Sequence, residues 1–405
     1  MMKYKLGDIA KTGSGGTPKS TVAEYYENGN IPWINSGELN NPFISSTSNF
    51  ITQKGYDNSS AKLFPPQTIL LAMYGATAGK ASLLEFEACT NQAICAIMPN
   101  QDILLPRFLK YKLDTMYNYL VGLSTGSARD NLSQDGIKAL ELCIPPLSEQ
   151  KKIVSVLSAL DDKIALNKKM NQKLEAMAKR LYDYWFVQYD FPDKNGRPYK
   201  TSGGPMTYNQ TLKREIPAGW EVATLANFAE YVKTTTKFDK AFNYVSTDNM
   251  LAEKQGLSGE NLKPASGNVL CYEKGDILIS NIRPYFKKIW YADQSGTCST
   301  DVLCIRSLKS DNSYFVYKTL WQDDFFDYVM QGAKGSKMPR GDKTRIMNYP
   351  ICIAKENFDE LIIKFSALVV PMQTVIQKNT KEITRLTTLR DKLLPLLMNG
   401  QVEVE

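Results

Sequence analysis

An internal repeat constrains the fold of this chain more than any other feature. Three of the seven cysteines recur after one 209-residue interval, in the pairs Cys89 and Cys298, Cys95 and Cys304, and Cys143 and Cys352. The apolar runs 68–71 and 276–279 each follow a turn and predict one short buried strand per half. Self-similarity over a long interval indicates duplicated structural units. We therefore expect two related domains of mixed α/β structure, and 405 residues suffice for each to bury its own core.

Each half ends in a long segment with apolar residues at 3-4 spacing, the pattern of a coiled-coil seam. The predicted seam residues are Leu157, Leu160, Ile164, Asn167, Leu174 and Leu181 in the first segment, and Met372, Ile376, Asn379, Leu386 and Leu393 in the second. Asn167 and Asn379 take matching positions and would fix the register, because a buried asparagine is satisfied only opposite a suitable partner. Pro371 is expected to begin a new helix or to kink one. Two such helices can pack on each other as a spacer.

The segment between the halves is rich in glycine, proline and charged residues, which is typical of a linker. We expect a first globular domain over 1–145, a first helical region over 146–189, a linker over 190–215, a second domain over 216–354 and a second helical region over 355–405.

The composition excludes several functions. The chain has no histidine and no C-x-x-C pair, so the usual zinc sets and histidine-based catalytic arrangements are missing, and we predict no catalytic residue, metal ligand or cofactor. The chain has no run of about 18 apolar residues that would predict a membrane span, and its N-terminus lacks an apolar signal core. Both observations predict a cytoplasmic protein. The net charge of +7 is compatible with an anionic partner.

Two stretches come close to a phosphate-binding loop. In GSGGTPKS, residues 13–20, Pro18 replaces the second glycine of the motif and removes a backbone N–H donor. The stretch GATAGK, residues 75–80, is one residue too short, and the 209-residue interval pairs it with 284–289. We expect the first stretch to be a flexible polar loop. Asn41-Pro42-Phe43 lacks a proline of the adenine-methyltransferase motif that it resembles, and an Asn-Pro turn explains it better.

Four motifs resemble the specificity (S) subunits of Type I restriction-modification systems: IPPLSEQ at 144–150, ALDDKI at 159–164, WFVQYDFP at 185–192, and GRPYKTSGG through IPAGWE at 196–221. The resemblance covers essentially the whole chain. It implies two globular target-recognition domains, each followed by a long helix, with the two helices packed as an antiparallel coiled coil.

The resemblance also implies a subunit without catalytic residues of its own. Such a subunit binds double-stranded DNA and two methyltransferase (M) subunits, and through them restriction (R) subunits that use ATP. The resemblance implies that the complex is a site-specific deoxyribonuclease and an adenine-specific DNA methyltransferase in one assembly. Each recognition domain would read one half of a split, asymmetric target, while the helices set the unread spacer.

The loops that differ between the halves are the best candidates for DNA contact, because phosphate and base recognition favours basic, aromatic and hydroxyl side chains. In the first half these are Ser14, Thr17, Lys19, Tyr74, Lys80, Ser127 and Arg129. In the second half they are Arg283, Tyr285, Lys287, Lys288, Lys334, Ser336, Lys337, Arg340, Lys343 and Arg345. A solvated basic turn beside a packed aromatic pair remains the alternative for the stretch from Arg283 to Lys288.

Two other functions stay open from the sequence. One is a self-sufficient enzyme that acts on DNA with a nucleotide or S-adenosylmethionine; its mark would be micromolar binding of that molecule without partners. The other is a purely structural coiled-coil adaptor, which would bind DNA without sequence preference or not at all.

Overall fold

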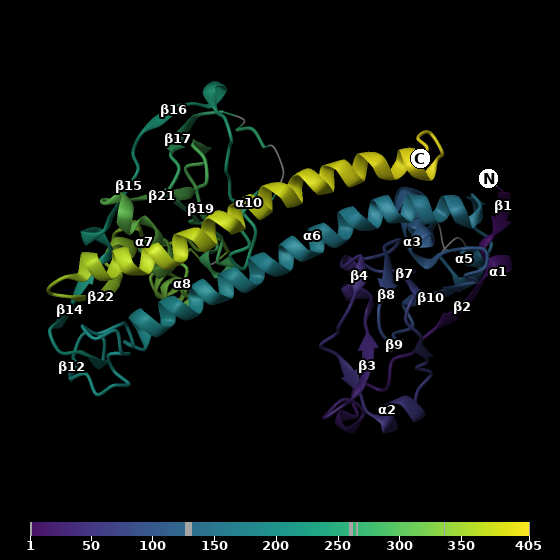
Figure 1. The fold of residues 1–405 in the computed structure, drawn as a ribbon, viewed down its shortest axis with the longest axis horizontal. Helices are drawn as coiled ribbons and strands as arrows, with labels where there is room; N and C mark the ends of the chain where they lie inside the picture. Colours follow the sequence, from purple (N-terminus) through teal and green to yellow (C-terminus); the bar gives the residue numbers. More distant parts are fainter. Residues whose placement is uncertain (1, 126–131, 259–261, 265, 336, 405) are drawn as a thin grey trace. The chain divides into compact units, whose positions relative to one another are not determined.

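The computed structural model describes residues 2–125, 132–258, 262–264, 266–335 and 337–404. The chain forms two compact units, the first from residues 1–164 and 385–405 and the second from residues 165–384. Each unit combines a mixed α/β domain with part of each of two long helices, α6 (Leu147–Tyr182) and α10 (Phe358–Met398) (Figure 1). The predicted fold class, with a long helix after each domain, is confirmed.

The first unit contains two main sheets. One has the strand order β2 (Ala10–Ser14), β10 (Ile94–Pro99), β7 (Ile69–Ala72), β8 (Ala81–Leu84) and β4 (Phe43–Ile44). The other has the order β5 (Phe50–Ile51), β3 (Ile31–Ile34), β9 (Ala88–Thr90) and β6 (Leu63–Phe64). The helices are α1 (Leu6–Ile9), α2 (Gln53–Asp57), α3 (Pro106–Thr115), α4 (Tyr117–Thr125) and α5 (Gln134–Lys138). A separate antiparallel pair, β1 (Met2–Lys5) with β11 (Glu141–Ile144), joins the two ends of the domain.

The second unit repeats this plan. Its larger sheet has the order β15 (Ala229–Tyr231), β21 (Val302–Ser307), β18 (Ile277–Ser280) and β19 (Ile289–Tyr291), and its smaller sheet β16 (Thr235–Lys237), β17 (Asn268–Tyr272) and β20 (Gly296–Cys298). The helices are α7 (Ser313–Leu320), α8 (Asp323–Gln331) and α9 (Lys343–Met347). β14 (Trp220–Thr224) pairs with β22 (Pro350–Ala354) and again joins the ends of the domain.

The stretch predicted to be a linker is folded over part of its length. It contains β12 (Met206–Asn209) and the start of β13 (Arg214–Pro217), which form an antiparallel hairpin. Before the hairpin, the backbone N–H and the hydroxyl of Thr201 donate to the carboxylate of Asp190 at 2.7 and 2.5 Å. The glycines and prolines of this stretch therefore mark turns that side chains hold in place.

The two predicted buried strands are β7 and β18, and both are buried on both faces. In β7, Ile69 and Leu71 lie in the core that α3 and α6 cover, whereas Leu70 lies in a second core on the other face. In β18, Ile277 and Ile279 lie in the core shared with α7 and α10, whereas Leu278 lies in a second core. Burial on both faces explains why these strands are continuously apolar.

The repeat is confirmed, but its interval changes by one residue within the sheets. Lys3 pairs with Cys143 and Val222 pairs with Cys352, so the last cysteine pair is equivalent as predicted. Cys95, however, lies in the helix-covered core with Leu71, whereas Cys304 lies in the opposite core.

The residue of the second unit that matches Cys95 is Leu303, which pairs with Ile279 as Cys95 pairs with Leu71. The interval here is 303 minus 95, or 208 residues. The prediction of a gap-free interval of 209 is wrong in these strands, because a slip of one residue turns every side chain to the other face.

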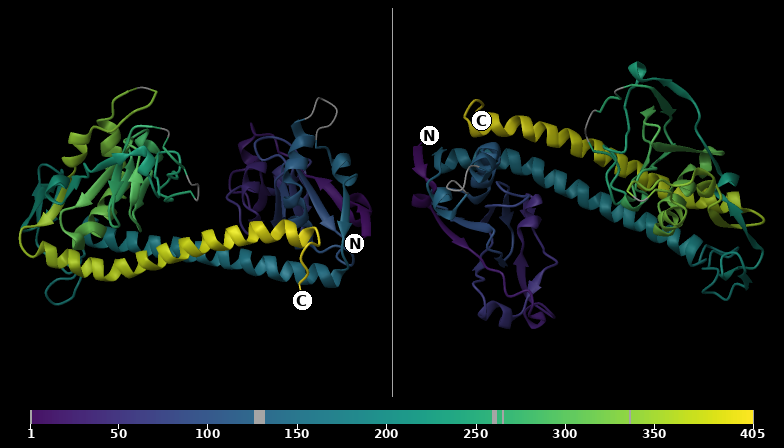
Figure 2. Two further views of the ribbon diagram at one scale, coloured as in Figure 1. Left: turned by 90° about the horizontal axis from the view of Figure 1, so that it is seen from above. Right: turned by 180° about the vertical axis from the view of Figure 1, so that it is seen from behind.

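Within each unit the segments of α6 and α10 run antiparallel. Figure 2 shows this antiparallel course of the two helices. In the second unit the Asn379 amide donates to Asn171 Oδ1 at 2.9 Å, and the rings of Phe365 and Tyr182 lie 6.0 Å apart between centroids. In the first unit Leu157 and Leu397 share one core. The predicted seam residues are all buried or half-buried.

Two details of the helices differ from the predictions. Asn379 contacts Asn171 and not Asn167. In an antiparallel pair, a residue later in one helix lies opposite a residue earlier in the other, so contacting residues do not follow the constant interval of the repeat. Helix α10 also continues unbroken through Pro371, so the expectation of a new helix at this proline is wrong.

Candidate nucleic-acid interface

The basic segment between α8 and α9 forms a closed turn in the second unit. Lys334 and Arg340 exchange two backbone hydrogen bonds of 3.0 and 2.9 Å, and Gly335 takes a φ of +98°, which favours glycine. The Asp342 carboxylate accepts N–H groups at the start of α9 and lies 3.4 Å from Lys334 Nζ. The hydrogen bond from the Arg345 N–H, together with Lys334, lowers the pKa of Asp342. The turn is therefore fixed at both ends.

The second basic segment predicted from the sequence lies directly beside this turn. The N–H of Arg283 donates to the carbonyl of Pro339 at 2.8 Å, and Ile282 forms an isolated bridge with Arg340. Arg283 precedes the single 3-10 turn η6 (Pro284–Phe286). The structure thus brings the two predicted DNA-contacting segments of the second half together into one surface.

The cations of this surface differ in their availability. Several bind other protein groups: Lys287 Nζ lies 2.6 Å from Asp323 Oδ1, Lys288 Nζ 2.6 Å from the Thr247 carbonyl, and Arg340 Nη2 3.1 Å from Asp301 Oδ1. Arg345 donates to the Tyr328 carbonyl and stacks on that ring, and Lys343 lies 5.9 Å from the Tyr231 ring. Arg283 and Lys337 are exposed and have no side-chain partner among the described residues. These two are the most available for an anionic ligand.

The loop of the first unit that corresponds to the stretch 283–288 is the glycine-containing stretch 75–80. Each loop is closed by a backbone hydrogen bond to a lysine carbonyl, from Ala72 to Lys80 at 3.0 Å and from Ser280 to Lys288 at 3.1 Å. Lys80 is therefore equivalent to Lys288 at an interval of 208, and its pairing with Ile289 is wrong. The sequence comparison missed this shared lysine because it was one residue out of register.

Both lysines reach the same neighbouring segment of their unit. Lys80 Nζ donates to Asn40 Oδ1 at 2.5 Å, just as Lys288 reaches the Thr247 carbonyl. Tyr74 precedes the first loop and is exposed. The lysines therefore anchor their loops, which accounts for their presence in both units.

The two loops share one backbone shape but differ in side chains. Gly75 and Gly79 have φ of +86° and +79°, and the equivalent Arg283 and Lys287 have φ of +50° and +51°. A left-handed backbone is free of strain for glycine and costs an L-residue about 1–2 kcal/mol. The glycines of GATAGK thus serve the shape of the turn, whereas the second unit holds two cations in the strained conformation.

The glycine-rich loop 13–20 is tightly packed and is not the flexible loop expected. A Cβ on Gly15 would lie 1.9 Å from the Thr90 carbonyl oxygen, and the N–H of Gly16 donates to the same oxygen at 2.9 Å. Its glycines are required by close backbone contact, so they do not form a phosphate cradle. Of the predicted contacts here, Ser14 ends β2 and is half-buried, whereas Thr17 and Lys19 are exposed.

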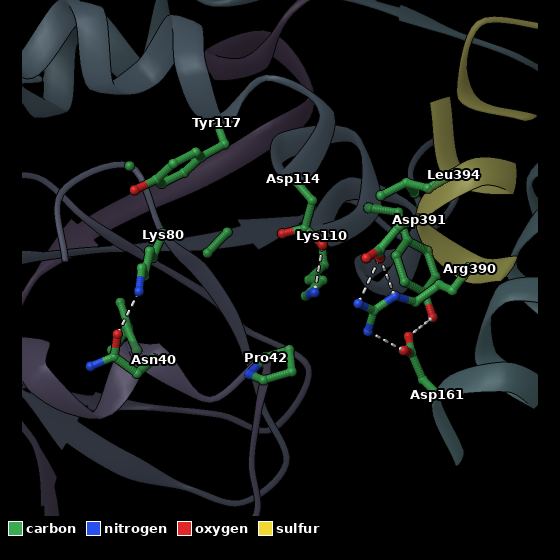
Figure 3. Close-up of a pocket in the computed structure, with 14 residues that line it drawn as sticks. Asn40, Pro42, Lys80, Lys110, Asp114, Tyr117, Asp161, Arg390, Asp391 and Leu394 are labelled. Carbon is green, nitrogen blue, oxygen red and sulfur yellow. Dashed lines mark hydrogen bonds and ion pairs between the residues drawn. The ribbon is translucent and has the colours of Figure 1, made fainter. Parts of the chain in front are cut away.

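A cavity of about 430 Å³ lies in the first unit between α3, the segment 39–42 and the two long helices (Figure 3). Its charges are paired: Lys110 lies 2.5 Å from Asp114, and Arg390 lies 3.0 Å from Asp161. The Tyr111 hydroxyl donates to the second oxygen of Asp161 at 2.6 Å, and burial raises the pKa of this hydroxyl. The exposed Asp391 carboxylate is bound as well, since Arg390 Nη2 lies 2.7 Å from its Oδ1. Because every carboxylate that lines the cavity is bound by a cation, the cavity is a structural junction between α3 and the helices.

Some predictions lie outside the described residues, namely those for Ser127, Arg129 and Ser336. Within the described part of the chain, no group of three histidine, cysteine, aspartate or glutamate residues could hold a metal ion. No described helix is both long and apolar enough to cross a membrane.

Comparison with known proteins points to one family. Residues 1–176 match the family model described as the Type I restriction modification DNA specificity domain. The chain is 28% identical to the Type I restriction enzyme MjaIX specificity subunit of Methanocaldococcus jannaschii, over 99% of this chain and 93% of that protein. It is 24% identical to the Type I restriction enzyme HindI specificity subunit of Haemophilus influenzae, over 99% of each.

A solved structure shares the fold. The S subunit of the Type I restriction-modification system from M. genitalium matches with a TM-score of 0.62 and 16% sequence identity, over 98% of this chain and 95% of that chain. At this identity the likeness concerns the fold alone.

Proposed function

Since this chain belongs to the family of Type I restriction-modification specificity subunits, we propose that it is the DNA-recognition subunit of such a system and that each unit reads one half of a split, asymmetric target. We assign target reading to residues 1–145 and 216–354. The observation that carries this proposal is the pair of domains with one scaffold and different loops. Equivalent loops with glycines in one unit and cations in the other can face DNA in the same way and read different bases.

The basic surface of the second unit is the proposed DNA contact. Lys337 and Arg283 are exposed and free of protein partners among the described residues, so each can bind a phosphate without breaking an ion pair. Arg340 is held by Asp301 and could present a guanidinium to a base edge. In the first unit Thr17, Lys19 and Tyr74 supply the corresponding exposed groups.

The helices α6 and α10 are the proposed spacer. A helix rises about 1.5 Å per residue, so paired helices of this length can hold two readers at a fixed separation. We further propose that the helical regions dock two methyltransferase subunits and that restriction subunits join through these. In this arrangement the chain itself supplies no catalytic residue.

A domain exchange tests the split reading of DNA. Residues 1–145 would be replaced by those of a related subunit with another target, and the methylated adenines of host DNA would be mapped by sequencing. We expect one half of the methylated sequence to change and the other half to stay. Exchange of residues 216–354 is the matched control and should change the other half. An unchanged sequence after both exchanges contradicts the proposal.

A salt titration tests the assigned phosphate contact. Lys337→Ala should weaken binding to target and non-target DNA alike and reduce the slope of log affinity against log salt by about one. Lys355→Ala, an exposed lysine outside the basic surface, is the control and should leave the slope unchanged. An unaltered slope for the Lys337 variant removes this residue from the interface.

A further inference from the structure

Strained backbone is concentrated around one turn of the second unit. Arg283 and Lys287 flank η6 with left-handed φ, and the facing residues Glu253 and Lys254 have φ of +52° and +62°. The two segments bind each other: the N–H of Glu253 donates to the carbonyl of Phe286 at 2.9 Å, and the N–H of Lys254 to that of Lys287 at 3.0 Å. Non-glycine residues in such conformations cluster where a function requires the geometry.

The fold itself does not require these side chains. The equivalent turn of the first unit has glycine at both left-handed positions and forms the same closing hydrogen bond. The shape of the turn therefore does not require the strain at Arg283 and Lys287. Lys287 serves the ion pair with Asp323, whereas the Arg283 side chain has no partner among the described residues.

The turn is held rigidly. Asp323, at the start of α8, binds Lys254 Nζ at 2.8 Å and Lys287 Nζ at 2.6 Å. The Lys254 ammonium also lies 4.3 Å from the centroid of the Trp321 ring. On the other side, the N–H of Arg283 is bound by Pro339. The turn is therefore tied to α8 on one side and to the basic turn on the other.

The residues held in this way are two aromatic side chains that point to solvent. Tyr285 is 45% exposed and Phe286 is 37% exposed, and their ring centroids lie 4.7 Å apart. Met338, on the adjacent basic turn, is 48% exposed. Exposed apolar groups between cations are the arrangement by which DNA-binding proteins insert a wedge between base pairs and bind the flanking phosphates.

We propose that Tyr285 and Phe286 form a wedge that enters a DNA groove and packs against one base step, while Arg283 binds a flanking phosphate. This inference rests on the proposed function. It assigns to the second unit a reading of DNA deformability, because unstacking is least costly at pyrimidine–purine steps. The first unit has a Gly/Ala turn at this place and no such wedge.

Fluorescence of 2-aminopurine tests the wedge, because this base brightens when it is unstacked. The full-length chain, assembled with its methyltransferase subunits, would be mixed with duplexes that carry 2-aminopurine at successive positions of the mapped target. We expect a rise at one step of the half-site that the second unit reads, away from the methylated adenine, which the methyltransferase subunits themselves extrude. The double variant Tyr285→Ala/Phe286→Ala should abolish the rise and weaken target binding about tenfold, the effect of losing a base-stacking aromatic.

Two controls separate the wedge from general damage. Tyr208→Ala removes an exposed tyrosine from the hairpin β12–β13 and should leave both the rise and the affinity unchanged. Tyr285→Phe keeps an aromatic ring and should keep the rise, and thermal melting should show that each variant is folded.

The outcomes distinguish this inference from the proposed function. Sequence-specific binding by the unmodified complex without a fluorescence rise at any step other than the methylated adenine overturns the wedge and leaves the proposed function intact. A rise away from the methylated adenine that persists in a folded double variant overturns it as well. If the unmodified complex shows no sequence preference for DNA, the proposed function and the wedge both fail.

Discussion

Replacement of Arg283 by glycine should make the second unit more stable while it weakens DNA binding. The left-handed φ of +50° costs an L-residue about 1–2 kcal/mol, and glycine removes this cost. Glycine also increases the entropy of the unfolded chain, which offsets about 0.5–1 kcal/mol of the stabilisation gained by removing the strain. The net gain is about 0.5–1 kcal/mol, since the Arg283 side chain has no partner among the described residues. For a unit of this size, the melting temperature should rise by about 1–4 °C.

Arg283→Ala is the matched control. Alanine lacks the charge but keeps the Cβ atom and therefore the strain, so its melting temperature should stay near that of the unmodified protein. Both variants should bind target DNA more weakly, because both lack the guanidinium. Scanning calorimetry and a DNA titration in one buffer measure the two effects.

The reverse substitution is available in the first unit. Gly75 occupies the equivalent position with a φ of +86°, and a Cβ there would meet no atom within 4 Å. Gly75→Ala should therefore destabilise the first unit by about 1 kcal/mol through backbone strain alone. If Arg283→Gly melts at the same temperature as Arg283→Ala and Gly75→Ala has no effect, the reasoning from strain is refuted.

Three further substitutions test the packing. Arg390→Met should destabilise the first unit by about 3 kcal/mol in chemical denaturation, because it leaves the buried Asp161 carboxylate without its cation, and adding Asp161→Asn should recover part of the loss. Asn379→Leu should cost about 1–2 kcal/mol by removing the donor to Asn171 Oδ1, and a double-mutant cycle with Asn171→Leu should show a coupling between the two; additive effects would contradict the contact. Hydrogen bonds from Lys254 and Lys287 hold the pKa of Asp323 at about 2, below its ordinary value. The contribution of Asp323 to the free energy of unfolding is therefore present above about pH 4 and is lost as the pH falls toward 2. This half-exposed group should contribute under about 1 kcal/mol, and Asp323→Asn should remove that part of the acid dependence of unfolding.

The sequence predicted the repeat and the long helices because these depend on periodic patterns along the chain. It did not give the register within the sheets, because a strand is placed by its partners and not by its own residues. Cys95 and Cys304 are identical in type and lie in equivalent strands, yet they face opposite cores. The identity of the cysteines favoured the interval of 209 residues. The burial of Leu303 in the helix-covered core shows that the interval in this strand is 208 residues.

The candidate interface was predicted in composition but not in geometry. Basic and aromatic residues marked the segments at 283–288 and 334–345, but nothing along the chain indicates that Arg283 lies against Pro339. The left-handed conformation of Arg283 and Lys287 was also beyond prediction, because residues other than glycine rarely adopt it. Gly75 and Gly79 of the first unit have the same left-handed conformation at the equivalent positions.

The short strand pairs at the base of each domain have an evolutionary consequence. β1 pairs with β11 and β14 pairs with β22, so the chain enters and leaves each domain on neighbouring strands, about 4.8 Å apart. A domain attached in this way behaves as a cassette: whatever lies between the two strands can lengthen, shorten or be exchanged by recombination while the helices keep their positions. Under the proposed function, a new DNA target would arise by replacing one domain, without any compensating change in the scaffold that carries it.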